Sequence, residues 1–137
     1  MGKSSLISIV DDDPFFRGSM RRLLRSLGYS VEAFQSAADF LASPRLAETA
    51  CLIVDVQMPA MTGFELYRYL IEAGRRIPTI FVTAYPGDVE RIPDKRIIYR
   101  LPKPVDEARL LRCLRAALRS GRPFEGSLGG SSRNPAA

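Results

Sequence analysis

The chain has 137 residues, of which 46% are hydrophobic and 26% charged, and its formal net charge is +5. This length and composition are typical of one globular domain, and no apolar stretch approaches the roughly 20 residues that span a bilayer. The sequence contains no histidine, which excludes Ser-His and Cys-His catalysis and argues against a zinc site.

Composition also bears on location and partners. Cys51 and Cys113 are too few for a disulfide framework, and the N-terminus lacks a signal-peptide pattern, so we expect two buried thiols in a cytoplasmic protein. Arginines lie opposite apolar stripes in two predicted helices, which favours solvated or protein-docking faces over the alternative of nucleic-acid contact. We therefore expect no direct DNA binding and no membrane contact. The arginine sets are Arg17, Arg21, Arg22 and Arg25, and Arg109, Arg112, Arg115 and Arg119.

The first half of the chain alternates apolar runs with helical patterns. Asp13 followed by Pro14 is a good N-cap and first-turn pair, and Gly28 is a natural C-terminal stop for the helix that follows. Ser36 with Asp39 three residues later resembles a capping box. The predicted elements are strands over 6–10 and 30–34 and helices over 14–27 and 37–42.

The second half repeats the alternation and ends in a tail. Gly74 closes one predicted helix, and Pro93 stops a single helical turn. Residues 121–137 are rich in Gly, Ser and Pro without a period, which predicts disorder after a domain spanning 1–120. The predicted elements are strands over 51–55, 78–83 and 96–101, helices over 64–73 and 105–119, and the turn over 88–92.

Strands alternating with helices predict a parallel sheet that is covered by helices on both faces. In such a sheet, ligands bind beyond the carboxyl ends of the strands. The residues that can carry chemistry all stand at or just after these ends, so we expect them to share one edge of the molecule. They are Asp11, Asp12, Asp55, Thr83 and Lys103.

The acidic residues suggest a metal and a phosphoryl group. Asp55 follows an apolar strand, where a carboxylate is costly unless it has a partner. Crowded carboxylates repel one another unless they share a cation, and Mg²⁺ prefers oxygen ligands. A carboxylate can also attack phosphorus to form an acyl phosphate, a reaction that a lysine and a hydroxyl would assist.

The order of these residues matches a known family. The motifs are Asp-Asp-Asp-Pro at 11–14, Asp-Val-Gln-Met-Pro-Ala-Met-Thr-Gly-Phe-Glu-Leu at 55–66, Val-Thr-Ala at 82–84 and Lys-Pro at 103–104. In them the chain resembles the receiver domain of two-component response regulators, especially the FixJ type, over about residues 5–120. The resemblance implies an α/β, flavodoxin-like (βα)5 fold with a doubly wound, five-stranded parallel sheet.

The resemblance also implies a role for each matched residue. A histidine kinase or a phosphotransfer protein would supply the phosphoryl group in a Mg²⁺-dependent reaction, and water would remove it. The bond before Pro104 is expected to be cis. In these roles Asp55 is the phosphoacceptor, and Mg²⁺ is held by Asp11, Asp12, Asp55 and the Gln57 backbone carbonyl. Thr83 is the switch hydroxyl, and Ala84 is its small neighbour. Lys103 pairs with the phosphate.

Two departures from the family pattern affect the reporting of phosphorylation. The family places an aromatic residue three positions before the lysine, where this chain has Arg100, and Tyr99 lies one place earlier. Either the strand carries a bulge or the aromatic switch is lost. The segment over residues 85–96 is short and broken by prolines. This pattern predicts a shortened or irregular fourth helix between the fourth and fifth strands, and it puts the usual output face in doubt.

Three functions compete. We expect a single-domain response regulator without an output domain, which signals through a downstream protein target or a phosphorelay and does not turn over an external substrate. The alternative is a phosphorylation-independent pseudo-receiver that acts as a binding scaffold. An aspartyl-phosphate phosphatase of similar topology would need a cap domain, for which the chain is too short.

Overall fold

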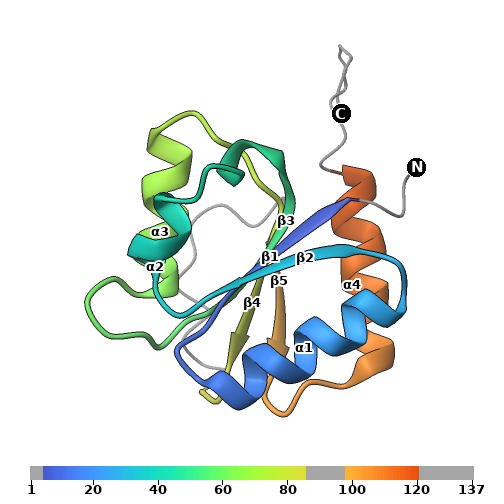
Figure 1. The fold of residues 1–137 in the computed structure, drawn as a ribbon. Coiled ribbons are helices and arrows are strands. Elements are labelled where there is room, and N and C mark those ends of the chain that lie inside the picture. Colours follow the sequence, from blue (N-terminus) through green and yellow to red (C-terminus); the bar gives the residue numbers. More distant parts are fainter. Residues whose placement is uncertain (1–4, 86–97, 121–137) are drawn as a thin grey trace.

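The computed structural model describes residues 5–85 and 98–120. In chain order these residues form β1 (Leu6–Val10), α1 (Pro14–Ser26), β2 (Ser30–Phe34), α2 (Ala37–Leu41), the 3-10 turn η2 (Leu46–Glu48), β3 (Thr49–Asp55), α3 (Gly63–Glu72), β4 (Thr79–Thr83), β5 (Ile98–Pro102) and α4 (Glu107–Ser120). The strands make one parallel sheet in the order β2-β1-β3-β4-β5 (Figure 1). The predicted doubly wound α/β sheet is confirmed.

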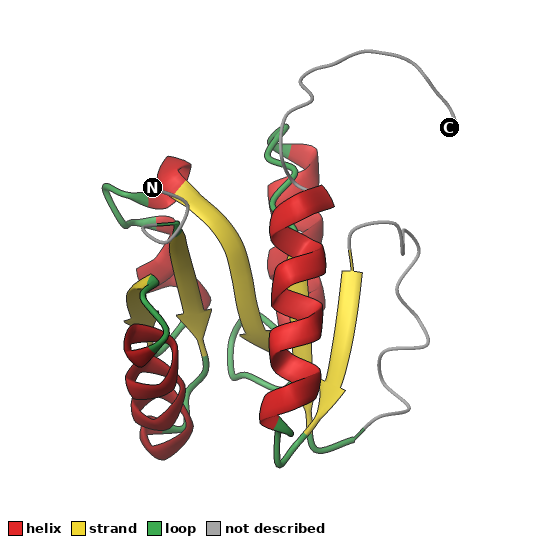
Figure 2. Ribbon diagram, turned by 90° about the vertical axis from the view of Figure 1, so that its right-hand side faces the viewer, coloured by secondary structure: helices red, strands yellow, loops and turns green. Residues whose placement is uncertain are grey.

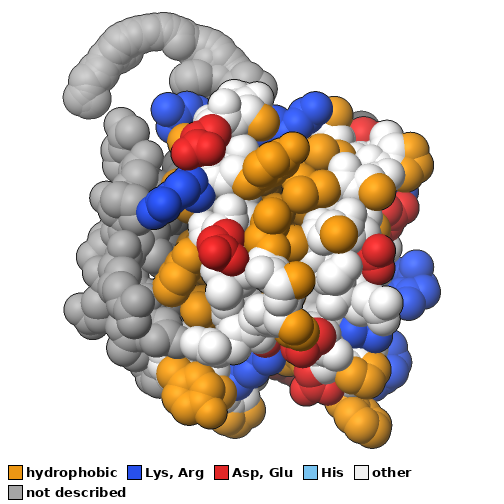
Figure 3. Space-filling view, turned by 90° about the vertical axis from the view of Figure 1, so that its left-hand side faces the viewer, with side chains coloured by type: hydrophobic (Ala, Val, Ile, Leu, Met, Phe, Trp, Pro, Cys, Tyr) orange, Lys and Arg blue, Asp and Glu red, His pale blue; other side chains and the backbone are white. Residues whose placement is uncertain are grey.

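Two helical layers enclose the sheet (Figure 1, Figure 2). Helices α1 and α4 pack on one face, where Ile9 and Ile53 of the sheet contact Leu24 and Leu110. Helices α2 and α3 pack on the other face around Phe81, whose ring lies 5.3 Å from that of Phe64. Figure 3 shows hydrophobic side chains clustered on the outer surface of this second layer.

The central strands are long apolar runs because both of their faces are covered. Every residue of β1 and β4 is buried, whereas β2, at one end of the sheet, is mostly half-buried. Strands enclosed on both faces lose the alternation of polar and apolar residues that marks a half-exposed strand. This explains why β1 and β4 were readily predicted from hydrophobicity alone.

Polar side chains fix the starts of the helices. The Asp13 carboxylate accepts the Phe15 N–H at 2.9 Å at the start of α1, as predicted from the Asp-Pro pair. A capping box opens α3, in which Thr62 accepts the Glu65 N–H at 3.1 Å and Glu65 accepts the Thr62 N–H at 2.9 Å. Gly28 follows α1 with a φ of +97°, a conformation in which a side chain is disfavoured.

Some boundaries differ from those predicted. Strand β3 begins at Thr49, two residues early, where Thr49 pairs with Leu6 of β1. A buried hydrogen bond of 2.8 Å also joins the Thr49 and Ser8 hydroxyls. Helix α4 begins at Glu107 rather than at 105, and the Asp106 carboxylate accepts the Arg109 N–H at 2.9 Å. Turn η2 was not predicted. Polar contacts of this kind are invisible to a hydrophobic pattern.

The structure tests only some of the remaining sequence predictions. The predicted helical turn over 88–92 and the predicted tail over 121–137 lie outside the described residues. The same is true of the shortened helix that was expected between β4 and β5, which is not the element labelled α4. No helix in the described ranges is long and apolar enough to cross a bilayer. Cys51 is buried as expected, while Cys113 is only half-buried. Burial raises the pKa of both thiols, and Arg109 and Arg112 partly oppose this rise at Cys113.

Candidate functional site

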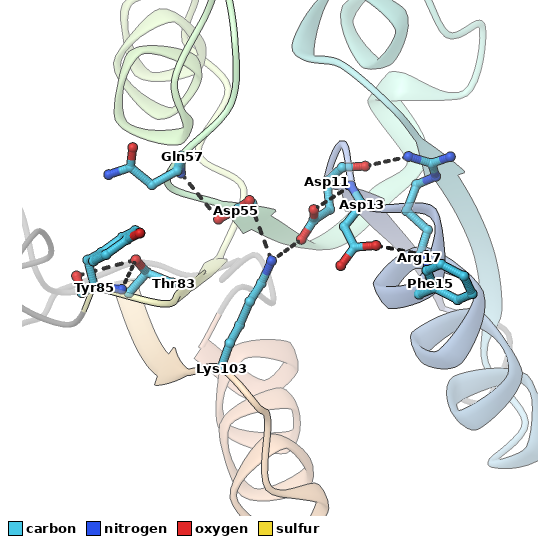
Figure 4. Close-up of polar contacts among 9 residues, drawn as sticks. All are labelled: Asp11, Asp13, Phe15, Arg17, Asp55, Gln57, Thr83, Tyr85 and Lys103. Atoms are coloured by element: carbon cyan, nitrogen blue, oxygen red, sulfur yellow. Dashed lines mark hydrogen bonds and ion pairs between the residues drawn. The ribbon is translucent and has the colours of Figure 1, made fainter.

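The carboxyl ends of the strands bring the predicted site residues to one edge of the sheet (Figure 4). Asp11 directly follows β1, and Asp55 and Thr83 are the last residues of β3 and β4. Lys103 follows β5, and its backbone N–H donates to the Thr83 carbonyl at 2.9 Å. Residues up to 92 positions apart in the sequence therefore meet because the strands are parallel and adjacent.

Three carboxylates form the centre of the site. Asp11, Asp12 and Asp55 each place a carboxylate oxygen within 4.8 Å of the others. The side chains of Asp11 and Asp55 are 0% and 8% exposed, whereas Asp12 is exposed. Burial, and next the charge of Asp11, raise the pKa of Asp55 above its usual value, and Lys103 and the Gln57 N–H only partly offset them. Burial and the neighbouring carboxylate therefore both disfavour the charged form of Asp55.

Among the described residues, Lys103 is the positively charged residue at the centre of this cluster. Its Nζ lies 2.8 Å from Asp11 Oδ2 and 3.5 Å from Asp55 Oδ2, and 4.6 Å from the centroid of the Phe16 ring. Burial lowers the pKa of Lys103, but its hydrogen bond to Asp11 and the charges of Asp11 and Asp55 together raise it. The Lys103–Pro104 bond is cis, as expected.

Asp11 is held more firmly than the sequence suggested. Its Oδ1 accepts the Asp13 N–H at 2.9 Å. Its backbone carbonyl accepts a hydrogen bond of 2.7 Å from Arg17 Nη1, although Arg17 was assigned to a solvated helix face. Phe16 and Arg17 were therefore missed as supports of the site. The only signal for them was their position in the first turn of the helix that follows the acidic residues.

Gly63 fixes the backbone beneath Asp55. A Cβ added at this position would lie 2.5 Å from the Asp55 carbonyl oxygen and 3.1 Å from Val56 Cα. The Gly63 N–H also donates to the Val56 carbonyl at 3.0 Å. The start of α3 therefore packs directly on the end of β3, and only a residue without a side chain permits this approach.

The Thr83 hydroxyl hydrogen-bonds to Tyr85 rather than to a carboxylate of the site. It donates to the Tyr85 carbonyl at 3.3 Å and accepts the Tyr85 N–H at 2.9 Å, while Tyr85 itself is 64% exposed. Ala84 lies in a bend between them and is exposed. The hydroxyl is thus engaged in a local turn beside the acidic cluster (Figure 4).

The register of β5 decides between the two alternatives for Tyr99. Strands β4 and β5 pair residue by residue from Thr79 and Ile98 to Thr83 and Pro102, without a bulge. Tyr99 is half-buried against the core on the sheet face that α4 covers, and Arg100, which pairs with Phe81, is exposed on the opposite side. The bulge is excluded, and no aromatic side chain of β5 stands on the Phe81 face at position 100.

Comparison with known proteins places this geometry in a family. The model of the response regulator receiver domain matches residues 7–115. The chain belongs to this family. The receiver is 39% identical over 120 residues to the response regulator protein TodT of Pseudomonas putida, covering 85% of this chain and 52% of TodT. It is 35% identical over 120 residues to the transcriptional regulatory protein TdiR of Thauera aromatica, with the same coverage.

Solved structures agree with the fold of this receiver. The response regulator StyR superposes with a TM-score of 0.75 at 36% identity, covering 88% of this chain and 62% of that one. FixJ-N superposes with a TM-score of 0.73 at 30% identity, covering 85% and 94%. The receiver spans about half the length of the curated relatives that it matches.

The acidic cluster fits the divalent cation that receivers generally bind at an acidic pocket. All three ligand candidates are carboxylates within 4.8 Å of one another, which is a donor set for a hard cation such as Mg²⁺. Lys103 is the one cation that contacts both Asp11 and Asp55 among the described residues, so a divalent cation would supply further positive charge beside three carboxylates. Gln57, the fourth predicted ligand, is adjacent, and its N–H donates to Asp55 Oδ1 at 3.2 Å.

Proposed function

We propose that this receiver accepts a phosphoryl group on Asp55 from a histidine kinase or a histidine phosphotransfer protein. Asp11, Asp12, Asp55 and the Gln57 carbonyl would hold Mg²⁺. The observation that carries this proposal is the shared contact of Lys103 with Asp11 and Asp55, at 2.8 and 3.5 Å, beside a third carboxylate. This arrangement combines an acceptor oxygen, oxygen ligands and a fixed cation at one strand edge.

In the proposed reaction an Asp55 carboxylate oxygen attacks the phosphorus of a phosphohistidine. The new O–P bond gives an acyl phosphate, the P–N bond breaks, and its electron pair returns to the imidazole of the donor. Lys103 already lies near Asp55 and would pair with the incoming phosphoryl oxygens. Bound Mg²⁺ would neutralise negative charge on the carboxylates and on the phosphoryl group. Hydrolysis of the O–P bond would return Asp55 to a carboxylate.

Thr83 and Tyr85 are the proposed route by which the modification is reported. The Thr83 hydroxyl now donates only a long hydrogen bond, of 3.3 Å, to the Tyr85 carbonyl. A phosphoryl oxygen on Asp55 would be a stronger, charged acceptor for the same proton. Turning the hydroxyl toward it would release Tyr85 and change the surface that a downstream protein binds.

One observation favours the scaffold as a second candidate. Because Arg100 is exposed where the family has an aromatic side chain, and Tyr99 is packed on the other face, the family's aromatic movement is not available to β5. A receiver of this kind could bind its target without a phosphorylation-dependent switch. The acceptor chemistry at Asp55 does not depend on this strand face.

Incubation with acetyl phosphate and Mg²⁺, followed by intact-mass measurement, tests the proposal. We expect one phosphoryl adduct, which is lost in Asp55→Asn and retained in the matched control Asp39→Asn, an exposed carboxylate on α2. Failure to form an adduct at any Mg²⁺ concentration would favour the scaffold. Continuous hydrolysis of general phosphate esters would instead indicate a phosphatase.

A further inference from the structure

The outer edge of β2 is open in the described part of the chain. Strand β2 pairs with β1 alone. The Ser30 N–H donates to the Ser5 carbonyl, and the Phe34 carbonyl accepts the Asp11 N–H. The even-numbered residues of β2 therefore direct their backbone groups toward β1. In a parallel ladder the residues between them direct N–H and C=O groups the opposite way. The outward pairs belong to Val31 and Ala33, and no residue within 5–85 or 98–120 hydrogen-bonds to them.

A basic groove runs along this edge. It has a volume of about 570 Å³ and is lined by β2 and by Arg21, Arg25 and Arg45. Arg45 is paired with Glu32 at 3.3 Å and with Glu48 at 3.0 Å. Arg21 and Arg25 are exposed, and neither has a carboxylate partner among the described residues. Helix α1 contains no acidic residue, so the groove keeps an excess of positive charge.

We propose that this groove binds an extended, acidic segment of a partner protein as an additional strand beside β2. Such a segment would pair with the outward backbone groups of Val31 and Ala33. Its side chains would alternate between the two faces of the sheet. Carboxylates on one face would meet Arg21 and Arg25, while Arg45, already paired with Glu32 and Glu48, lines the other side of the groove. The backbone provides binding, and the arginines select for acidic sequence.

The geometry disfavours two other occupants. A second copy of the chain, paired edge to edge through β2, would bring Arg21 and Arg25 near their own symmetry mates, and like charges in that position repel. A nucleic acid could use the arginines and the outward N–H groups. It would, however, set its phosphates against the outward carbonyls of Val31 and Ala33, which need donors. An extended polypeptide satisfies both kinds of backbone group.

The probe is an acetylated, amidated heptapeptide in which Glu and Val alternate, with Glu at both ends. We expect it to slow amide hydrogen exchange at Val31 and Ala33 at least about tenfold at saturation. Glu32, whose amide already faces β1, should change little and serves as the internal control. A Lys-for-Glu peptide tests charge, and a peptide N-methylated at alternate residues tests strand pairing. Equal binding by either control peptide would overturn the proposal.

Two charge-matched variants locate the site. Arg21→Glu/Arg25→Glu should weaken binding of the Glu-Val peptide roughly tenfold or more, because it replaces attraction with repulsion. Arg112→Glu/Arg115→Glu changes the same net charge on exposed positions of α4, and should alter binding less than about twofold. Equal losses in the two variants would mean general electrostatic attraction. Tight binding of a 20-base-pair duplex, lost only in the α1 variant, would identify a nucleic-acid surface instead.

Discussion

The two sides of the strand-end site differ in how they are held. On the acceptor side, Lys103 contacts both Asp11 and Asp55, and Arg17 and Gly63 support these residues through the backbone. On the reporting side, the Thr83 hydroxyl hydrogen-bonds to the exposed Tyr85, and the nearby Arg100 is exposed. The chemistry thus rests on buried groups that pair with one another. The response to it rests on a hydroxyl that is bonded to an exposed loop residue, Tyr85, which can move without disturbing the core.

The largest predicted effect concerns the backbone under Asp55. Gly63→Ala places a Cβ 2.5 Å from the Asp55 carbonyl oxygen, so one backbone segment must shift, at a cost of about 3 kcal/mol. Urea unfolding would measure the loss. Gly18→Ala is the matched control, because its Cβ would meet only the flexible Arg22 side chain at 3.4 Å and should stabilise α1 by roughly 0.5–1 kcal/mol. Similar values for both variants would refute the close approach.

On the reporting side, two neighbouring residues of β5 should behave differently. Tyr99→Ala removes a half-buried side chain packed against the core on the face that α4 covers and should lower the free energy of unfolding by roughly 2–3 kcal/mol. Arg100→Ala alters an exposed residue and should change it by less than about 0.5 kcal/mol. The same chemical-denaturation experiment compares them. A large loss at Arg100 with little at Tyr99 would reverse the faces assigned to this strand.

Removal of the Lys103 ammonium group from the acceptor side should have an intermediate effect on the free energy of unfolding. Lys103→Met leaves the buried Asp11 and Asp55 carboxylates without their amine and should cost about 2 kcal/mol in a Mg²⁺-free buffer. Arg45→Met, which breaks the exposed pairs with Glu32 and Glu48, should cost much less. Because Mg²⁺ and Lys103 share these carboxylates, Mg²⁺ should stabilise Lys103→Met more than the parent chain, and an equal gain would contradict this.

The sequence predicted one side of the site much better than the other. Asp55, Asp11 and Lys103 follow strands whose apolar runs are unmistakable, and parallel strands bring their carboxyl ends together whatever the loops do. The contribution of Arg17 could not be predicted, because its hydrogen bond to the Asp11 carbonyl depends on where α1 begins relative to β1. The face of Tyr99 depended on the register of β5, which composition left open between a bulge and a regular ladder.

Mg²⁺ itself should stabilise the folded receiver. With Mg²⁺ at ten times its dissociation constant, a site that exists only in the folded state adds roughly 1.4 kcal/mol, seen as a higher melting temperature in calorimetry. Asp12→Asn should abolish this gain. It should not lower the Mg²⁺-free stability, because it removes one of three mutually repelling carboxylates and Asp12 is exposed. Glu72→Gln, at the end of α3, is the control. Undiminished stabilisation in Asp12→Asn would remove Asp12 from the site.

The smallest predicted effect tests strain in the loop that follows Asp55. Ala60 has a φ of +69°, and the Met61 N–H donates to the Pro59 carbonyl across it at 2.8 Å. A side chain in this left-handed conformation costs roughly 1–2 kcal/mol. Ala60→Gly should therefore raise the free energy of unfolding by about 0.5–1 kcal/mol after the entropy of glycine in the unfolded chain is subtracted. Because this loop connects Asp55 to Gly63, a gain in stability with unchanged phosphorylation would show that the acceptor geometry is set by the strand and helix, and that the loop strain contributes nothing to it. A slower reaction with acetyl phosphate would instead make the strained turn part of the acceptor side.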